Sequence, residues 1–288
     1  MTNYKGRIIK GIGGFYYVDT AAGVFECRAR GIFRKEKITP LVGDMVEISV
    51  DETSKTGSVD LIMPRKNCFI RPPVSNVTQM AVVVAAANPK PNLYLLDKLI
   101  AAAEDKDIQI LICWNKMDLE EFPSEVEIYE KAGFKVIRVS AETGQNIDIL
   151  KKSLKDEITV FAGNSGVGKS SLLNQILGDG TFETGEVSER VERGKHTTRH
   201  SELASLPEGG YIIDTPGFGS LEIGETDYTD FAYLFREFEP YLGGCKFRDC
   251  SHTVEIGCKV LEALKNGGIS QSRHDSYCRL IKETDVKK

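Results

Sequence analysis

The chain contains 288 residues, of which 41% are hydrophobic and 27% are charged, with a formal net charge of −5. No apolar run approaches the roughly 20 residues that a membrane-spanning helix needs, so we expect a globular protein with no membrane partner. At roughly 100 to 200 residues per domain, one large core with one or two small modules is expected. The first six residues lack the apolar stretch of a secretory signal, which favours a cytoplasmic protein with reduced thiols. We expect a monomer, although the sequence pattern does not determine the oligomeric state.

Charge is distributed unevenly along the chain. Lys and Arg outnumber Asp and Glu by 11 to 8 in residues 1–68 and by 9 to 6 in residues 245–288, whereas residues 69–244 carry 17 basic and 28 acidic side chains. Both ends are therefore basic around an acidic middle. A basic patch is the electrostatic signature of a phosphate-backbone partner, although an excess of this size also suits a solvated surface.

Residues 1–68 have the pattern of short β-strands. Phe25 and Cys27 alternate with charged residues, and Val46 and Ile48 alternate with polar ones. Glycine-containing turn signals separate these runs, which predicts a small antiparallel barrel of about five strands. We expect an all-β OB-fold that binds RNA on one face. An SH3-like barrel, or an interaction module without a nucleic-acid role, fits the same pattern.

From about Asn76 the pattern changes to apolar runs that alternate with amphipathic helices. Strands are predicted at 80–87, 108–114, 134–139 and 158–162, and helices at 93–100, 147–154 and 170–177. Continuous apolar strands between helices indicate a parallel sheet covered on both faces. The sequence therefore predicts a doubly wound α/β domain in the middle of the chain.

The first motif of this region is Asn115-Lys116-Met117-Asp118, at the end of a predicted strand. Asp118 is the discriminating group, because an ionised carboxylate only accepts hydrogen bonds and guanine offers two adjacent donors, whereas adenine offers none at N1. Asn115 is expected to bind the ring edge and join this base loop to the phosphate loop. Lys116 is expected to cover the base with its stem.

The second motif is the phosphate-loop pattern Gly163-Asn164-Ser165-Gly166-Val167-Gly168-Lys169-Ser170, which follows a strand and opens a helix. Backbone N–H groups of this loop cradle phosphates, Lys169 reaches the β and γ phosphates as a catalytic group, and the Ser170 hydroxyl ligates Mg²⁺. Ser140-Ala141 would offer a backbone N–H to the guanine O6, as the corresponding element does in GTPases. The predicted nucleotide-binding residues are Asn115, Lys116, Asp118, Ser140, Ala141, Gly163, Asn164, Ser165, Gly166, Val167, Gly168, Lys169, Ser170, Ser171 and Gly217.

The third motif, Asp214-Thr215-Pro216-Gly217, follows a predicted strand. Asp214 can hold Mg²⁺ through water, and the Gly217 amide can sense the γ-phosphate. Ras-like enzymes place a Gln after this motif to orient the attacking water. Phe218 occupies that position here and cannot hold water through hydrogen bonds, so another group must do so.

Residues 178–199 are charged and punctuated by glycine, which predicts a mobile switch that orders on a partner. Either Thr197 or Thr198 would complete the Mg²⁺ shell. The adjacent His196 is the candidate catalytic residue, since histidine is the commonest proton-transfer side chain. The alternative is that His196 is an exposed loop residue without a catalytic part.

Near the C-terminus three thiols and an imidazole occur within fourteen residues, as Cys245, Cys250, His252 and Cys258. Three cysteines and one histidine suit a closed tetrahedral site of the structural type, which in a reduced compartment favours one Zn²⁺ over disulfides. A helix is predicted to start near Ser270. The remaining cysteines are interpreted as packed or buried apolar residues: Cys27, Cys68, Cys113 and Cys278.

The motifs stand in a rotated order, because the common GTPase arrangement has the phosphate loop first and the Asn-Lys-x-Asp element late. This order, with a barrel before it and a Cys/His cluster after it, resembles the RsgA (YjeQ) family of ribosome small subunit-dependent GTPases over essentially the whole chain. Gly194-Lys195-His196-Thr197-Thr198 resembles the switch I of the family, in which Arg normally precedes the His. The same order brings Asp214 within about thirty residues of Cys245, so we expect the γ-phosphate sensor to act on the zinc module.

The resemblance implies an OB-fold at 1–68, a circularly permuted P-loop GTPase domain at 69–224 and a mostly helical zinc-binding domain at 225–288. It implies a GTP-hydrolysing factor that uses Mg²⁺ with GTP and binds the 30S small ribosomal subunit and its 16S rRNA late in maturation, with turnover stimulated by the subunit. Two alternatives stay open. Phe218 fits a non-enzymatic GTP-gated RNA-binding adaptor, and the motifs also allow a GTPase that acts on a different ribosomal or RNA partner.

Overall fold

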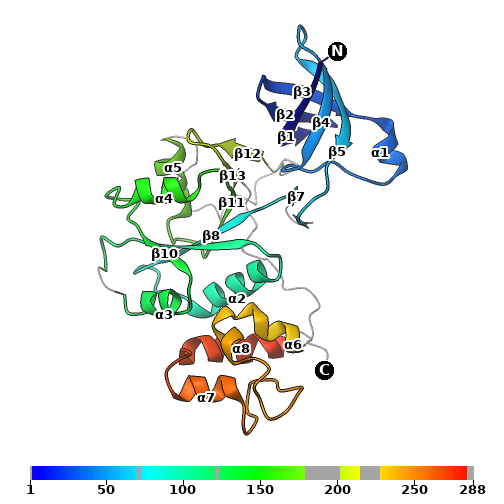
Figure 1. Ribbon diagram of the computed structural model, residues 1–288. Helices are drawn as coiled ribbons and strands as arrows, with labels where there is room; N and C mark the ends of the chain where they lie inside the picture. The colour runs from blue at the N-terminus through cyan, green and yellow to red at the C-terminus, as the bar shows by residue number, and fades with distance from the viewer. Residues whose placement is uncertain (1, 70–72, 121–122, 179–201, 215–227, 284–288) are drawn as a thin grey trace, which may run out of the picture. The chain divides into compact units, whose positions relative to one another are not determined.

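The computed structural model describes residues 2–69, 73–120, 123–178, 202–214 and 228–283 (Figure 1). The chain forms two compact units. The first comprises Met1–Gln79, Lys152–Val160 and Glu186–Phe218, and the second comprises Met80–Lys151, Phe161–Gly185 and Gly219–Lys288. Among the described residues, no helix combines the length and the apolar character that a membrane span requires.

The first unit contains a closed five-stranded barrel. Its strands are β1 (Thr2–Ile12), β2 (Phe15–Thr20), β3 (Gly23–Ala29), β4 (Met45–Asp51) and β5 (Thr56–Ile62). They follow the order β1-β2-β3-β5-β4, and β1 pairs with β4 to close the barrel. Strands β3 and β5 are parallel, and the other neighbours are antiparallel. The predicted OB-fold is confirmed.

Alternation of side chains explains the barrel interior. Phe25, Cys27, Val46 and Ile48 are all at most 4% exposed, as the period-2 pattern predicts. The short helix α1 (Gly31–Lys35) connects β3 to the loop before β4 and carries exposed basic side chains.

The prediction that Cys68 is buried is wrong. Cys68 lies in the short strand β6 (Cys68–Phe69), which pairs with β7 (Val74–Ser75). Neighbouring residues of a strand point to opposite faces, and Phe69 occupies the buried face, so the thiol of Cys68 is exposed.

Strands from later in the chain continue the first unit beside the barrel. β12 (Glu202–Ser205) is antiparallel to β1 and to β13 (Tyr211–Asp214), and β13 is parallel to β11 (Ile158–Ala162). The Tyr211 hydroxyl donates to Asp19 of β2 at 2.8 Å. The strand that ends at Asp214 is therefore linked to the barrel, an arrangement that the sequence pattern did not predict.

The second unit is built on the strands β8 (Gln79–Ala85), β9 (Gln109–Asn115) and β10 (Lys135–Arg138), in the order β10-β9-β8, and β9 and β10 are parallel. Every residue of β8 is buried, as expected for a strand covered on both faces. The helices of this region are α2 (Leu93–Glu104), α3 (Val126–Lys131), α4 (Ile147–Ser153) and α5 (Lys169–Leu177). The predicted α/β architecture is confirmed, and α3 is an element that the sequence pattern missed.

The C-terminal part of the second unit is mostly helical, as predicted. It contains α6 (Tyr228–Phe231), two 3₁₀ helices at Ala232–Leu234 and Arg236–Tyr241, α7 (Lys259–Lys265) and α8 (Gln271–Glu283). Phe231, Phe235 and Phe238 pack around Tyr277 with ring centroids 4.9 to 5.8 Å apart. Ala101 of α2 belongs to the same buried cluster, so these helices share a core with the α/β region.

Candidate nucleotide site and metal centre

The phosphate-loop residues lie between β11 and α5, the strand–loop–helix context that the motif requires. Gly163, Gly166 and Gly168 have φ angles of 140°, 77° and 92°, which favour glycine. A Cβ on Gly163 would lie 2.3 Å from the Val83 carbonyl oxygen, and one on Gly168 would lie 2.4 Å from Asn115 Nδ2. Glycine is therefore needed here both for its conformation and for the close approach of neighbouring segments.

Lys169 begins α5 beneath this loop. Its ammonium group donates to the carbonyl oxygens of Gly163 at 2.9 Å and Asn164 at 2.7 Å. Burial lowers the pKa of Lys169, since desolvation disfavours the charged form. Ser170 and Ser171 follow in the first turn of the helix and are half-buried.

Asn115 joins the base loop to the phosphate loop, as the sequence predicts. Its Nδ2 donates to the Val167 carbonyl at 2.9 Å, and its Oδ1 accepts from the Ala141 N–H at 3.1 Å. The side chain is 1% exposed, so these hydrogen bonds form away from water. Three loops that are far apart in the sequence are held together by one amide.

The Asp118 carboxylate is exposed at the end of this arrangement and accepts a hydrogen bond from the Ser140 hydroxyl. Ser140 itself is fully buried. The sequence motif predicts only a backbone role for this position, whereas in the structure the Ser140 side chain orients Asp118. Lys116 has a φ of 64°, and its ammonium group donates to the Asn88 carbonyl.

Several predicted residues lie outside the described part of the chain. They are His196, Thr197, Thr198, Gly217 and the neighbouring Phe218. Asp214 is described only as the last residue of β13, the position at which the sequence places it. The predicted mobile switch at 178–199 falls almost entirely on the undescribed range 179–201.

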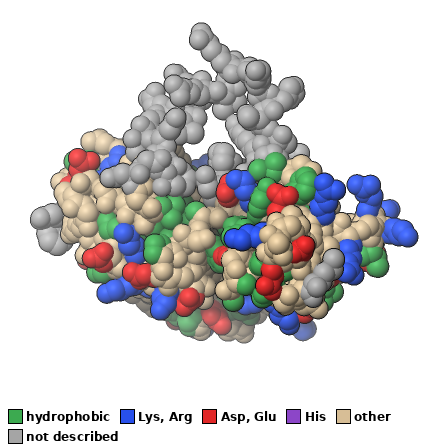
Figure 2. Space-filling view, turned by 90° about the horizontal axis from the view of Figure 1, so that it is seen from above, with side chains coloured by type: hydrophobic (Ala, Val, Ile, Leu, Met, Phe, Trp, Pro, Cys, Tyr) green, Lys and Arg blue, Asp and Glu red, His purple; other side chains and the backbone are tan. Residues whose placement is uncertain are grey.

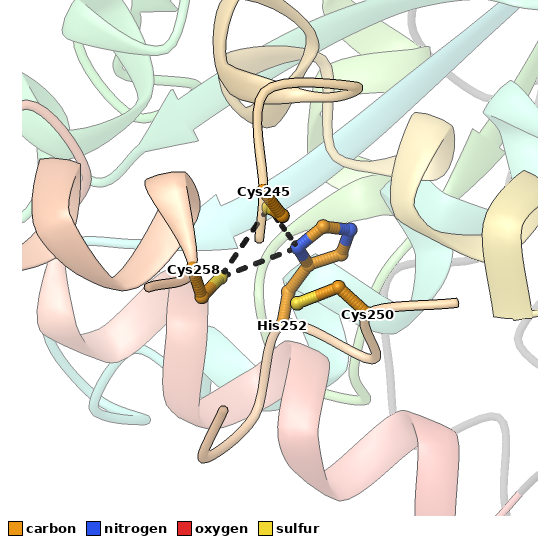
Figure 3. A group of neighbouring side chains, drawn as sticks. All are labelled: Cys245, Cys250, His252 and Cys258. Atoms are coloured by element: carbon orange, nitrogen blue, oxygen red, sulfur yellow. Dashed lines mark hydrogen bonds between the residues drawn. The ribbon is translucent and has the colours of Figure 1, made fainter. Parts of the chain in front are cut away.

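The four predicted metal ligands converge (Figure 3), and their ligand atoms all lie within 4.8 Å of one another. Cys245 Sγ lies 3.6 Å from His252 Nδ1 and 3.9 Å from Cys258 Sγ, and the last two atoms are 3.4 Å apart. Ligands of a tetrahedral Zn²⁺, with bonds of about 2.3 Å to sulfur and about 2.0 Å to nitrogen, lie roughly 3.5 to 3.8 Å from one another. The set fits one zinc ion and is completed by Cys250.

The chemistry of the thiols agrees with this geometry. Burial raises the pKa of the Cys250 thiol to about 12, so a thiolate at this place needs a cation beside it. The Cys258 sulfur caps α7 by accepting from the Leu261 N–H at 3.5 Å, and the Lys259 N–H donates to Cys245 Sγ at 3.3 Å. A zinc ion would stabilise the fold here, since all four positions are filled by protein.

The loop that carries these ligands is fixed to α8. His274 Nε2 lies 2.8 Å from the His252 carbonyl oxygen, and the Tyr277 hydroxyl donates to the Ser251 carbonyl at 2.9 Å. Within the loop, Glu255 accepts from the backbone N–H groups of Ser251 and Thr253 at 2.8 and 3.0 Å. The loop of the metal cluster is therefore joined to α8 through two side chains of the helix.

A buried ion-pair network that sequence reasoning missed joins α8 to α2. Arg273 donates to Asp97 at 2.7 Å and to Glu237 at 2.6 Å, and the three side chains are 1%, 0% and 7% exposed. The Tyr129 hydroxyl donates to Asp97 at 2.9 Å, and the guanidinium carbon lies 4.6 Å from the Phe235 ring centroid. Asp97 and Arg273 are 176 residues apart, so no local signal in the sequence could pair them.

A phosphate loop between a strand and a helix, held to a base-reading loop that precedes it in the chain, defines a circularly permuted P-loop GTPase. Comparison with known families agrees with this class. The RsgA GTPase family pattern matches residues 62–224, and the pattern of the RsgA N-terminal domain matches residues 5–59. The chain belongs to the RsgA GTPase family.

Individual relatives are similar along nearly the whole chain. A protein of Ruminiclostridium cellulolyticum named small ribosomal subunit biogenesis GTPase RsgA is 48% identical over 96% of this chain and 92% of its own length. A protein of the same name from Alkaliphilus metalliredigens is 50% identical over 97% of both chains. The crystal structure of YjeQ from Thermotoga maritima has a TM-score of 0.85 at 34% identity, with complete coverage of both chains. The structure of YloQ, described as a circularly permuted GTPase, has a TM-score of 0.84 at 36% identity and covers 99% of this chain and 96% of that one.

Proposed function

We propose that the chain is a GTP-hydrolysing biogenesis factor of the small ribosomal subunit. The observation that carries this proposal is the Asn115 side chain, which holds the guanine-reading loop of Asp118 against the phosphate loop at Val167. This link places the two loops side by side, so that one ligand can span both of them, as a guanine nucleotide does. Relatives at 48% and 50% identity carry the name of a small ribosomal subunit biogenesis GTPase, which supports the choice of partner.

Within this site Asp118 accepts hydrogen bonds from the guanine N1–H and 2-amino groups, and the backbone N–H of Ala141 donates to the guanine O6. Lys169 and the loop amides bind the β and γ phosphates. Mg²⁺ accompanies GTP in this family, and the side chains that would hold it here are Ser170, Asp214 and either Thr197 or Thr198. Held by these side chains, the ion would neutralise charge on the phosphates during phosphoryl transfer.

His196 orients the attacking water in our proposal. Hydrolysis needs a group that positions water in line with the γ-phosphate, and Phe218 follows the third motif where Ras-like enzymes have Gln. An imidazole can hold and move a proton where a phenyl ring cannot. The products are GDP and inorganic phosphate.

The flanking modules bind RNA in this proposal, with an OB-fold at 1–68, the GTPase domain at 69–224 and the zinc domain at 225–288. Barrels of this type bind oligonucleotides, and the basic excess of both ends suits a contact with 16S rRNA of the 30S subunit. Tethering two weak RNA-binding modules to one GTPase raises the effective concentration of each for its own site. The factor acts in the cytoplasm as a monomer during late maturation of the subunit.

The deciding experiment is the rate of GTP hydrolysis with purified small subunits, with large subunits and with neither. We expect low intrinsic turnover and stimulation confined to small subunits. Stimulation confined to large subunits would overturn the assignment of the partner, and equal rates under all three conditions would show that the partner does not complete the site.

A single-turnover measurement separates the enzyme from the adaptor. The unmodified protein and the His196→Ala variant are each mixed with GTP and small subunits. Cleavage by the unmodified protein alone supports a catalytic His196, whereas cleavage by neither protein supports a GTP-gated adaptor without hydrolysis. Equal cleavage by both would remove His196 from the mechanism.

A further inference from the structure

The segment 88–92 contacts both nucleotide loops of the second unit. The Lys116 ammonium of the base loop donates to the carbonyl of Asn88. Pro89 lies beside the phosphate loop, because a Cβ on Gly166 would be 3.7 Å from its Cδ. No sequence motif assigns the segment 88–92 to a nucleotide site. It nevertheless lies beside the two loops that carry nucleotide-binding motifs.

Helix α2 follows this segment directly and packs closely behind the phosphate loop. The Asn92 side chain caps the helix by accepting from the Leu95 N–H at 3.0 Å. Leu95 and Leu96 share a cavity of only about 20 Å³ with Gly163 and Val167, which leaves room for about one water molecule. In such close packing a shift of α2 must displace the segment or the phosphate loop.

Another side chain of α2, that of Asp97, is bound by the C-terminal helices. Asp97 is fully buried, and its only ionic partner among the described residues is Arg273 of α8. The same guanidinium binds Glu237, so it ties α2 to two C-terminal elements at once. An uncompensated charge in this position would be strongly unfavourable, which fixes the register of α2 against α8.

The residue after Arg273 continues the connection to the metal loop. His274 binds the carbonyl of the metal ligand His252, and Tyr277, one turn further along α8, binds that of Ser251. The contacts therefore run without a gap from the cysteine cluster through α8, Arg273 and α2 to segment 88–92 at the nucleotide loops.

We propose that Arg273 is a positioning residue for the guanine nucleotide. By fixing α2 through Asp97, it holds segment 88–92 against Lys116 and Gly166, so the C-terminal module is part of the frame of the nucleotide site. This inference rests on the proposed function, since it requires a guanine nucleotide at that site. Binding of nucleotide and order in the metal module are then coupled, and the coupling is reciprocal.

The first test compares Arg273→Gln with Arg236→Gln in the full-length, zinc-loaded protein. Arg236 pairs with Glu104 at the far end of α2 and is 36% exposed, so its loss breaks an ion pair at the same interface without touching Asp97. The dissociation constant of fluorescent GDP is measured together with zinc content. We expect Arg273→Gln to weaken GDP binding about 10-fold or more with zinc retained, and Arg236→Gln to change it less than about 2-fold.

The outcomes separate this inference from the proposed function. If the unmodified protein binds no guanine nucleotide, the proposed function fails. If the unmodified protein binds GDP and Arg273→Gln binds it equally tightly, the function stands and the inference is wrong. Equal losses in both variants would also overturn it, because they would show a general loss of interface stability.

A second measurement needs no variant and so does not depend on folding of Arg273→Gln. Hydrogen exchange of the unmodified protein is followed with and without GDP. Saturating GDP is expected to slow exchange in α8 around residues 273–277 as well as in α2. Protection confined to the nucleotide loops and α5, with α8 unchanged, would contradict the coupling.

Discussion

In the proposed function, guanine recognition would depend on a single carboxylate, that of Asp118, whose direction is set by a neighbouring side chain. Asp118 is exposed to solvent, but the hydroxyl of the buried Ser140 holds it in place. An exposed carboxylate that must meet two donors of a planar base gains from such orientation, because less side-chain entropy is lost when the ligand binds. We therefore expect separable roles for the two residues: Asp118 in base choice and Ser140 in preorganisation.

This separation predicts different results for two substitutions. Asp118→Asn replaces one acceptor with a donor, so GDP binding should fall by about 100-fold or more, while xanthosine diphosphate, which has a carbonyl in place of the 2-amino group, should bind better than GDP. Ser140→Ala should weaken GDP binding by only about 5- to 10-fold and leave the preference for guanine unchanged. Competition titrations with GDP, XDP and ADP measure both effects. A change of base preference in Ser140→Ala would contradict the assignment.

A glycine substitution tests the link between the two nucleotide loops. In Gly168→Ala the new Cβ would lie 2.4 Å from Asn115 Nδ2, so the bond from Asn115 to Val167 must break or lengthen. Gly133→Ala is a matched control, since Gly133 also has a positive φ, 84° against 92°, but has nothing within 4 Å of the added atom.

Both variants should lose about 1 to 2 kcal/mol of stability from backbone strain. Only Gly168→Ala should lose most of its GDP affinity, because only there does the methyl group meet the amide that joins the loops. Thermal unfolding and GDP titration of each variant measure these two effects. Unimpaired GDP binding by Gly168→Ala would show that the link is dispensable.

Local patterns in the sequence predict elements well and long-range partners poorly. The strand Ile158–Ala162 and the helix that follows the phosphate loop are found almost to the residue, because apolar runs and glycine spacing are local signals. Helix α3 was missed because it is short. Its six residues include two glutamates, one tyrosine and one lysine, so no helical period of apolar residues can be recognised. The strand β12 was missed although β13, its main partner, is close in the sequence, because its four residues contain only one large apolar side chain, Leu203.

The same limit applies to the candidate site. The identity of the phosphate loop, the base reader and the metal ligands is readable from residue types at short spacing. The hydroxyl role of Ser140 and the pairing of Asp97 with Arg273 depend on which helices and loops meet in the fold. Segment 88–92 reads only as a turn rich in Asn and Pro, and its contact with Lys116 appears only once the sheet has brought the loops together.

Among the elements of the C-terminal part, we expect zinc at the metal cluster to be a main source of stability against unfolding. A zinc ion ligated by Cys245, Cys250, His252 and Cys258 would hold the loop that caps α7 and contacts α8, so the ion would contribute directly to folding. We expect one zinc ion per chain by elemental analysis, and a lower melting temperature after chelation.

Cysteine variants distinguish this site from general thiol chemistry. Cys258→Ser should lose the metal and unfold at a lower temperature, whereas Cys278→Ser, outside the cluster in α8, should keep one zinc ion per chain. Loss of zinc from Cys278→Ser, or its full retention in Cys258→Ser, would show that the ligand set is wrong.

Over the whole molecule, the proposed function assigns the basic ends to RNA and the acidic middle to the nucleotide. Figure 2 shows Lys and Arg side chains gathered at the end of the barrel that carries α1, at the right of the view. Arg34, Lys35 and Lys37 are exposed there, and none of them has a carboxylate partner among the described residues. Unpaired surface cations are free to contact phosphates without first losing an ion pair.

This arrangement predicts how salt affects docking on small subunits. The logarithm of the association constant should fall linearly with the logarithm of the salt concentration, because each contact between a cation and a phosphate releases counterions. Replacing Arg34 and Lys35 with Ala should weaken binding and reduce the magnitude of this slope by about 1 to 2. Lys131→Ala, which removes an exposed lysine of α3, is the control and should leave the slope unchanged.

Sedimentation of the GTP-analogue complex with small subunits between about 50 and 200 mM salt measures the slopes. Equal slopes for the unmodified protein and the Arg34/Lys35 variant would mean that α1 faces away from the RNA, and the barrel contact would then have to lie on another part of its surface.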